Sequence, residues 1–253
     1  MLNAWRARTT DPRQARFLTV ASIGWVVRHR AYTPWYLLRY WRFWRFKVAN
    51  PHVITTGFVF LGRGTEVFAR PGFGRLILGR WVHLGDGTSL RCHEGNLAIG
   101  DKVVFGRNNV VNAYLDVSIG AASIVADMVY VADFDHNFSD ADRPIKDQGI
   151  TKSPIRIGAD VWLANKVTVV RGVHIGDGSV VGANAVVTGD LPPYSIAAGV
   201  PARVIRSRLD DHEAHSATRA ALNDMASKLD RVRPTDQPVR SKNARQTIES
   251  DRE

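Results

Sequence analysis

The most regular feature of the chain is a six-residue period in its aliphatic positions between residues 157 and 192. Each unit opens with an aliphatic residue, and a small residue usually follows it. The opening residues are Ile157, Leu163, Val169, Ile175, Val181 and Val187. A period of six fits neither an amphipathic helix nor a plain alternating strand. It predicts a hexapeptide solenoid, in which three short strands and three turns make one triangular coil.

The same period continues towards the N-terminus, so we expect the solenoid to occupy residues 57–208. Pairs such as Leu84-Gly85 and Ile119-Gly120 keep the pattern of an aliphatic residue followed by a small one. The aliphatic side chains should point inward and stack from coil to coil. The small residue should lie at a tight corner, where a larger side chain would clash and glycine can adopt a positive φ. An ordinary sheet with glycine-rich turns is the alternative.

One long segment, residues 133–154, interrupts the period with the sequence DFDHNFSDADRPIKDQGITKSP. A solenoid tolerates an insertion at a corner because the stacking of its coils is local. We therefore expect a single loop that leaves the solenoid. Long loops without structure of their own are usually functional, and this one is rich in aspartate and contains His136.

Both ends of the chain lack the repeat and should add helical extensions to the mainly β fold. Residues 1–56 contain five of the seven tryptophans, and their segment 34–50 should form a helix that ends before Pro51. Residues 209–253 should contain a helix over about 210–232 and then a disordered polar tail from Arg233.

Charge is unevenly distributed along the chain. The formal net charge is +10, and no acidic residue occurs between Asp11 and Glu66, where nine basic residues lie. Arginine and tryptophan alternate along segment 34–50, which suits a helix in a membrane interface. Docking of its aromatic rings on the first coil is the alternative, and the absence of a recognised motif argues against a nucleic-acid partner. The apolar run of residues 17–27 is too short to span a bilayer.

The sequence from about residue 57 to residue 208, most specifically from 133 to 206, resembles the hexapeptide-repeat O-acetyltransferases. This family includes galactoside, maltose, sialic-acid and exopolysaccharide acetyltransferases. The resemblance rests on VADFDHNF, on PIRIGADVWLANKVTVVRGVHIGDGS and on the closing GVPARVIR. It implies a left-handed parallel β-helix, a homotrimer, acetyl-CoA as the donor and active sites in the clefts between subunits. A sugar, polysaccharide precursor or glycolipid would be the acceptor.

His136 is the candidate general base. A sugar hydroxyl attacks a thioester only when a base removes its proton, and imidazole titrates close to neutral pH. Relatives often read D-H-x-H at this place, and this chain has Phe134 instead of the first histidine. Asp133 and Asp135 lie beside His136, where the acceptor would bind, and either is a candidate to orient the ring. A solvated loop histidine is the alternative.

Other site residues are implied by the resemblance alone. Asn112 matches an asparagine that contacts the acceptor sugar, with an inward-stacked ladder asparagine as the alternative. On the donor side, the tryptophan lies beside the acetyl group, and a backbone N–H near the following small residue could donate to the thioester oxygen. The two arginines would bind the phosphates of CoA. The implied donor-side residues are Trp162, Ala164, Ala183, Thr188, Arg203 and Arg206.

Two other functions are alternatives to acyl transfer. A zinc enzyme of the γ-carbonic-anhydrase type needs three histidines with a spacing that this chain lacks, so we expect no metal. A non-catalytic solenoid that serves as an assembly platform is the second alternative. The single cysteine, Cys92, cannot form an internal disulfide and suits a reducing compartment. We therefore expect a cytoplasmic protein whose residues 1–50 either contact the inner face of the membrane or pack on the solenoid.

Overall fold

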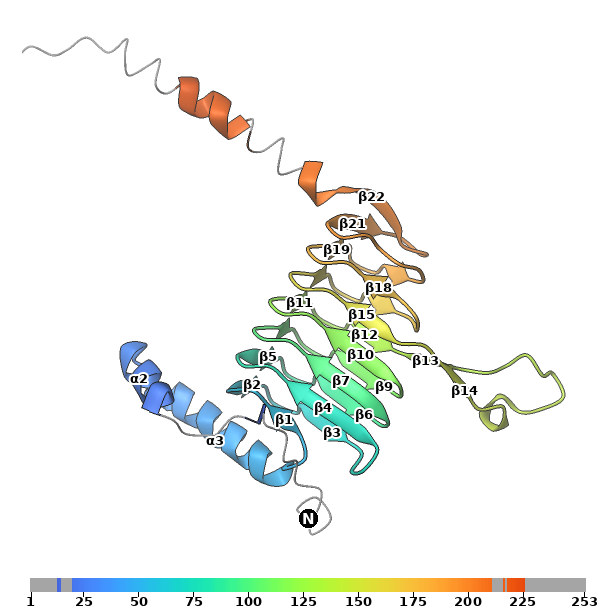
Figure 1. The fold of residues 1–253 in the computed structure, drawn as a ribbon, viewed down its shortest axis with the longest axis horizontal. Helices are drawn as coiled ribbons and strands as arrows, with labels where there is room; N and C mark the ends of the chain where they lie inside the picture. Colours follow the sequence, from blue (N-terminus) through green and yellow to red (C-terminus); the bar gives the residue numbers. More distant parts are fainter. Residues whose placement is uncertain (1–12, 15–19, 211–215, 217, 226–253) are drawn as a thin grey trace, which may run out of the picture. The chain divides into compact units, whose positions relative to one another are not determined.

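The computed structural model describes residues 13–14, 20–210, 216 and 218–225, and a parallel β-solenoid forms its main body (Figure 1). Three sheets run along the solenoid, one on each side of the triangular coil. Sheet A contains β1 (Ile54–Thr55), β4 (Gly74–Leu78), β7 (Gly95–Ile99), β10 (Asp116–Ile119), β15 (Ile155–Ile157) and β18 (His174–Ile175). The predicted solenoid is thereby confirmed.

The other two sheets repeat the same order of parallel neighbours. Sheet B contains β2 (Val59–Leu61), β5 (Val82–Leu84), β8 (Val104–Phe105), β11 (Ile124–Val125), β16 (Trp162–Leu163), β19 (Val180–Val181), β21 (Ser195–Ala198) and β22 (Arg203–Ser207). Sheet C contains β3 (Glu66–Ala69), β6 (Ser89–Cys92), β9 (Val110–Ala113), β12 (Tyr130–Ala132), β17 (Thr168–Val169) and β20 (Val186–Val187). Strand β22 pairs antiparallel with β21 and ends sheet B.

Aliphatic side chains stack in register inside the coils, as the period predicts. In sheet A, each member of one row pairs with its equivalent one coil away, and all are at most 2% exposed: Leu78, Ile99, Ile119, Ile157 and Ile175. Full burial of one such side chain contributes roughly 1.5–3 kcal/mol. The rows therefore hold each coil to the next.

The small residue after the aliphatic one is required for space and not for its backbone conformation. A Cβ placed on Gly85 would lie 2.0 Å from the carbonyl oxygen of Gly106 on the next coil. The positive φ falls two positions later and is often taken by a residue other than glycine, as at Asn108 with φ 55°. The expectation that one glycine serves both purposes is therefore wrong.

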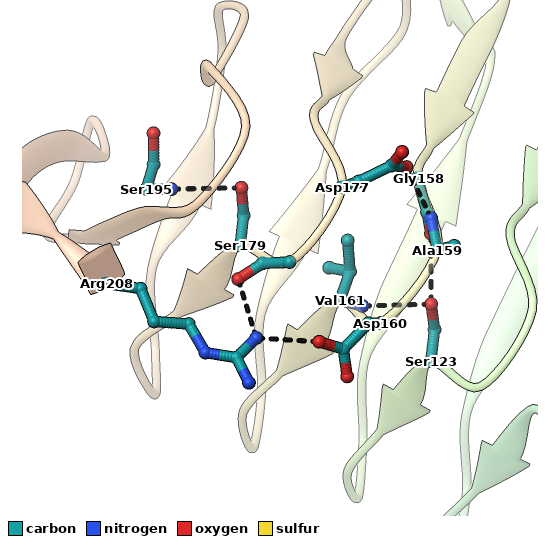
Figure 2. Close-up of polar contacts among 10 residues, drawn as sticks. Ser123, Gly158, Ala159, Asp160, Val161, Asp177, Ser179, Ser195 and Arg208 are labelled. Atoms are coloured by element: carbon teal, nitrogen blue, oxygen red, sulfur yellow. Dashed lines mark hydrogen bonds and ion pairs between the residues drawn. The ribbon is translucent and has the colours of Figure 1, made fainter. Parts of the chain in front are cut away.

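Polar side chains tie the corners of neighbouring coils together. The carboxylate of Asp177 accepts the backbone N–H of Ala159 at 2.7 Å (Figure 2). The buried Ser123 hydroxyl donates to the Gly158 carbonyl at 3.0 Å and accepts the N–H of Val161. These contacts satisfy backbone groups that turn away from the ladders of the sheets.

Arg208 binds the segment that follows the last strand to the coils of the solenoid. Its guanidinium donates to the Asp160 carboxylate at 2.8 Å and to the Gly178 carbonyl at 3.0 Å, so that it touches two successive coils (Figure 2). Its own backbone N–H donates to the Tyr194 carbonyl at 2.7 Å. The residue after β22 is thus held to the body by three hydrogen bonds.

Residues 133–154 leave the solenoid between β12 and β15, but they have structure of their own. Strands β13 (Phe134–His136) and β14 (Ile150–Lys152) pair antiparallel, and a 3₁₀ turn, η1 (Ile145–Asp147), lies between them. Figure 1 shows this projecting hairpin, residues 133–154, extending away from the coils. The expected unstructured loop is therefore a β-hairpin with an irregular tip.

Helices α2 (Val20–Arg28) and α3 (Pro34–Ala49) precede the first coil. Thr33 and Pro34 begin α3 as predicted, because proline at the first turn needs no N–H donor. Phe43 is 3% exposed and packs edge-on against Phe58, so α3 docks on the first coil. Trp41 and Trp44 remain more than half exposed. No helix in the described ranges is long and apolar enough to cross a membrane.

Residues from 211 onward form a separate unit. Within it, residues 218–225 are helical, inside the predicted 210–232 helix. The tail predicted from Arg233 lies outside the described residues.

Candidate active site

Asp133 organises the root of the projecting hairpin. The residue is fully buried, and its carboxylate accepts the backbone N–H groups of Tyr114, Leu115 and Asp116, each at 2.8 Å. Its carbonyl accepts the N–H of Ser153 at 2.9 Å, across the hairpin base. With both carboxylate oxygens occupied and no exposure, Asp133 does not fit the expected contact with substrate or with His136. Its part is structural.

His136 lies on β13 with its side chain exposed, opposite Ile150 of β14. Its ring makes an edge contact with Phe134 at a centroid distance of 6.2 Å. The neighbouring Asp135 pairs with Arg171 of the next coil, Oδ2 to Nε at 2.7 Å. In the described part of the chain, neither aspartate is hydrogen-bonded to the imidazole. The ring is therefore accessible, and the strand that carries it is fixed.

A row of aromatic rings continues from the hairpin along the corner between sheets C and A. Phe134 contacts Tyr114 at 4.5 Å, and Tyr114 stacks on His93 at 4.6 Å with an interplanar angle of 15°. Lys152 of β14 pairs with Glu94 at the same corner and lowers the pKa of that carboxyl through a hydrogen bond. Sequence reasoning missed this row. The one signal is a spacing of about one coil between His93, Tyr114 and Phe134.

Asn112 faces outward from β9, whereas Val111 and Ala113 on either side are buried. The asparagine that stacks inside the coil is Asn109, whose Oδ1 accepts the N–H of Val129 at 2.8 Å. The ladder alternative for Asn112 is therefore wrong. Its Oδ1 is buried and, among the described residues, has no hydrogen-bond partner. An acceptor hydroxyl would satisfy it.

The implied donor residues gather on the side of sheet B. Trp162 points outward from β16 and is 49% exposed. Ala164 and Ala183 follow β16 and β19 at the next corner. The N–H of Ala164 itself donates to the Val181 carbonyl at 2.9 Å, so this particular N–H is not free for a thioester oxygen.

The arginines of the closing motif lie on the last strand of the same sheet. Arg203 pairs with Ala198 and Arg206 with Ile196, and both side chains are exposed. Thr188 lies elsewhere, at the corner that follows β20 of sheet C. The structure thus brings most implied donor residues to one side of the solenoid and leaves Thr188 apart from them.

The candidate general base and the implied donor residues occupy different parts of one chain. His136 belongs to a hairpin that leaves the corner between sheets C and A, whereas Trp162 and the arginines belong to sheet B. No three His, Cys, Asp or Glu side chains in the described ranges are grouped as metal ligands would be. Among the described residues, one chain alone does not assemble a complete site from the implied residues.

Comparison with known proteins gives a consistent result. Residues 154–189 match the family model described as bacterial transferase hexapeptide (six repeats). The probable acetyltransferase Rv3034c of Mycobacterium tuberculosis is 58% identical over 219 residues, which are 86% of this chain and 73% of that protein. The galactoside O-acetyltransferase of Escherichia coli is 36% identical over 121 residues, which are 46% of this chain and 59% of that protein.

A solved structure shares the fold. It is a serine-to-alanine mutant of AntD, an N-acyltransferase from Bacillus cereus, in complex with dTDP-4-amino-4,6-dideoxyglucose and coenzyme A. The match has a TM-score of 0.54 at 16% identity and covers 69% of this chain and 96% of that one. The six-residue repeat, the solenoid and the 58% identical relative together show that the chain belongs to the hexapeptide-repeat acetyltransferases. It is therefore an acyltransferase.

Proposed function

We propose that this acyltransferase moves an acetyl group from acetyl-CoA to a hydroxyl of a sugar, polysaccharide precursor or glycolipid, with His136 as the general base. The imidazole takes the hydroxyl proton as the oxygen attacks the thioester carbonyl. Collapse of the tetrahedral intermediate forms the ester and expels the CoA thiolate, which receives a proton. The products are an O-acetylated sugar and free CoA.

The observation that carries this proposal is an accessible imidazole on a strand fixed at two points. Buried Asp133 fixes the root of the hairpin, and the Asp135–Arg171 ion pair ties β13 to the next coil. Preorganisation of this kind keeps a base within reach of its substrate. Asn112 takes an outward position on sheet C, beside the corner where the hairpin leaves, and its buried Oδ1 would accept a hydrogen bond from the acceptor.

Relatives support the acetyl donor and the sugar acceptor. One of them is named a galactoside O-acetyltransferase, and the solved N-acyltransferase holds CoA with a nucleotide sugar. In this chain, Trp162 and Ala183 would line the path of the pantetheine arm, and Arg203 and Arg206 would pair with the phosphates of CoA.

We further propose that the protein acts as a homotrimer with composite sites. An outward row on sheet B is apolar and exposed, with Val104 at 42%, Ile124 at 50% and Trp162 at 49%. Large exposed apolar surfaces mark interfaces. Packing of this row against a neighbouring copy would bring the hairpin of one subunit to the donor side of the next.

A membrane-facing role for the N-terminal helices belongs to the same proposal. Side chains spaced three or four residues apart form an exposed stripe that is 51–88% exposed. The exposed stripe consists of Val20, Ile23, Val27, Leu37, Trp41, Trp44 and Val48. Docking and membrane contact are compatible, because Phe43 packs on the coil while the side chains of the exposed stripe remain open to solvent. The enzyme would then meet its acceptor at the cytoplasmic face of the membrane.

The general-base assignment is tested by thiol release from acetyl-CoA over a panel of sugars. We expect His136→Ala to lower turnover by about 10² or more with CoA binding retained. His174→Ala is the matched control, since it removes an exposed histidine from sheet A, and it should leave turnover unchanged. Turnover that survives His136→Ala would move the base elsewhere. Absence of both turnover and CoA binding would favour an assembly platform.

Subunit complementation tests the composite site. His136→Ala and Trp162→Ala should each be impaired alone. When equal amounts of the two are refolded together, one of the three clefts in each mixed trimer regains both side chains. About three quarters of the trimers are mixed, so activity should recover to about one quarter. No recovery, in trimers shown to be mixed, would place both residues in one chain's site.

Membrane contact is tested by sedimentation with vesicles that contain phosphatidylglycerol. The pair Leu37→Ser and Trp44→Ser should abolish co-sedimentation, because both side chains belong to the exposed stripe. The pair Phe73→Ser and Phe138→Ser removes equally exposed rings elsewhere and should have no effect. Equal behaviour of the two pairs, or no binding by the wild type, would refute the contact.

A further inference from the structure

A cavity of about 450 Å³ lies between α3 and the first coil, far along the chain from the hairpin that carries His136. Its helical wall includes Trp41, Arg42, Arg45 and Phe46. Its opposite wall is the end of β2 and the corner that follows it, residues 61–65, together with Val67. The volume lies within the range of ligand-binding pockets in proteins.

The lining contains three arginines and no acidic residue. Arg42 donates to the Leu61 carbonyl at the long distance of 3.5 Å, and Arg45 lies 5.7 Å from the ring centroid of Trp41. Over the described ranges, neither of them nor Arg63 forms an ion pair. The three positive charges repel one another across the concave surface. A bound anion would relieve this repulsion, and the concave shape strengthens the electric field that attracts it.

A backbone donor of the first coil adds to this charge. At the corners between sheets B and C, the residue with positive φ donates its N–H to the coil before, as Gly87 does to Arg63 and Asn108 to Asp86. Gly64 holds that position in the first coil with φ 64°, and no coil precedes it. Its N–H has no partner among the described residues, and Gly64 lines the cavity.

Guanidinium groups and free backbone N–H groups together are the usual partners of phosphate. We propose that this cavity binds a phosphate or diphosphate group through Arg42, Arg45, Arg63 and the Gly64 N–H. Trp41 belongs both to its lining and to the exposed stripe, so the ligand would enter beside the membrane-facing surface. The group could belong to a phospholipid or to a free or acceptor-linked phosphate, and the experiment separates these sources.

Inorganic pyrophosphate tests the free source by calorimetric titration of the full chain. The double variant Arg42→Gln/Arg63→Gln should weaken pyrophosphate binding about tenfold or more. The control Arg28→Gln/Arg107→Gln removes the same charge, and Arg107 occupies the corner position equivalent to Arg63 two coils on. The control should change affinity less than about twofold. Arg63→Gln keeps the backbone bond to Asp86, so the corner should stay folded.

Vesicles test the lipid source. Phosphatidylcholine vesicles with phosphatidic acid are compared with vesicles that carry the same charge as oleate. The cavity binds a lipid headgroup if three results hold together. The wild type prefers the phosphatidic acid vesicles, Arg42→Gln/Arg63→Gln loses this preference while the control variant keeps it, and pyrophosphate does not bind. The cavity binds a free or acceptor-linked phosphate if pyrophosphate binds the wild type and the control variant but binds Arg42→Gln/Arg63→Gln more weakly. Equal effects of the two double variants, or no binding of either probe, would overturn the proposal. None of these readouts depends on acetyl transfer.

Discussion

Replacement of Asp133 by asparagine is the sharpest test of how the hairpin is held. The carboxylate accepts three backbone N–H groups, with Oδ1 bonded to Tyr114 and Oδ2 bonded to Leu115 and Asp116. Asparagine keeps one acceptor oxygen of nearly the same shape. If that oxygen stays on Leu115 and Asp116, the amide nitrogen must face the Tyr114 N–H, which is also a donor.

The expected cost follows from these contacts. A hydrogen bond to a charged group is worth about 1.5–3 kcal/mol, and a buried donor left without a partner costs about 1–3 kcal/mol. Because Asp133 is fully buried, water cannot replace the lost acceptor. We expect Asp133→Asn to lower the free energy of unfolding by about 3–5 kcal/mol, a large part of the about 5–15 kcal/mol typical of a domain.

Urea unfolding followed by circular dichroism measures this loss. Asp127→Asn is the matched control, because its carboxylate accepts a single N–H, from Arg107, at an exposed corner. It should cost about 1 kcal/mol or less. The reasoning is refuted if the two variants lose the same free energy at unchanged m-values. A loss of turnover in Asp133→Asn, with CoA binding intact, would show that the hairpin root also positions His136.

Three other predictions concern stability and reactivity. Gly85→Ala should lower the urea midpoint through contact with the Gly106 carbonyl, at a cost of about 1–3 kcal/mol, whereas Gly189→Ala, with open space around it, should not. Burial lowers the pKa of Lys47 to about 8, so the unfolded chain binds the extra proton between about pH 8 and 10, and stability should rise with pH in that window. Lys47→Met should flatten that rise. Burial raises the pKa of the Cys92 thiol to about 11, so an aromatic disulfide reagent at pH 8 should label it only in urea.

The solenoid could be predicted because its period is written in local residue choice. An aliphatic residue that stacks inward and a small residue that meets the next coil recur every six positions, and every coil repeats the same choice of residues. The helix at residues 34–49 was equally local, since Thr33-Pro34 begins it and Pro51 follows it. Local requirements of this kind leave a direct mark on the sequence.

The site could be predicted less well because its contacts cross coils. Asp133 lies next to His136 in sequence, yet its carboxylate turns to residues about one coil earlier, and nothing in the local sequence indicates this. The N–H of Ala164 likewise donates to the Val181 carbonyl of the next coil. Among the described residues the Gly64 N–H has no partner because no coil lies before the first one, and the local sequence gives no sign of this.

One structural rule links the two binding regions proposed for this enzyme. In the middle of a solenoid, each corner is covered by the coils before and after it, so its backbone donors are occupied, as at Ala164. Two kinds of place lack this cover: an insertion that leaves the stack, and an end of the stack. The hairpin with His136 is the first kind, and the arginine-lined cavity beside Gly64 is the second. Because α3 covers that end and turns the exposed stripe outward, an acceptor with a phosphate group at a membrane would meet the cavity beside the membrane and would have to reach the hairpin several coils away.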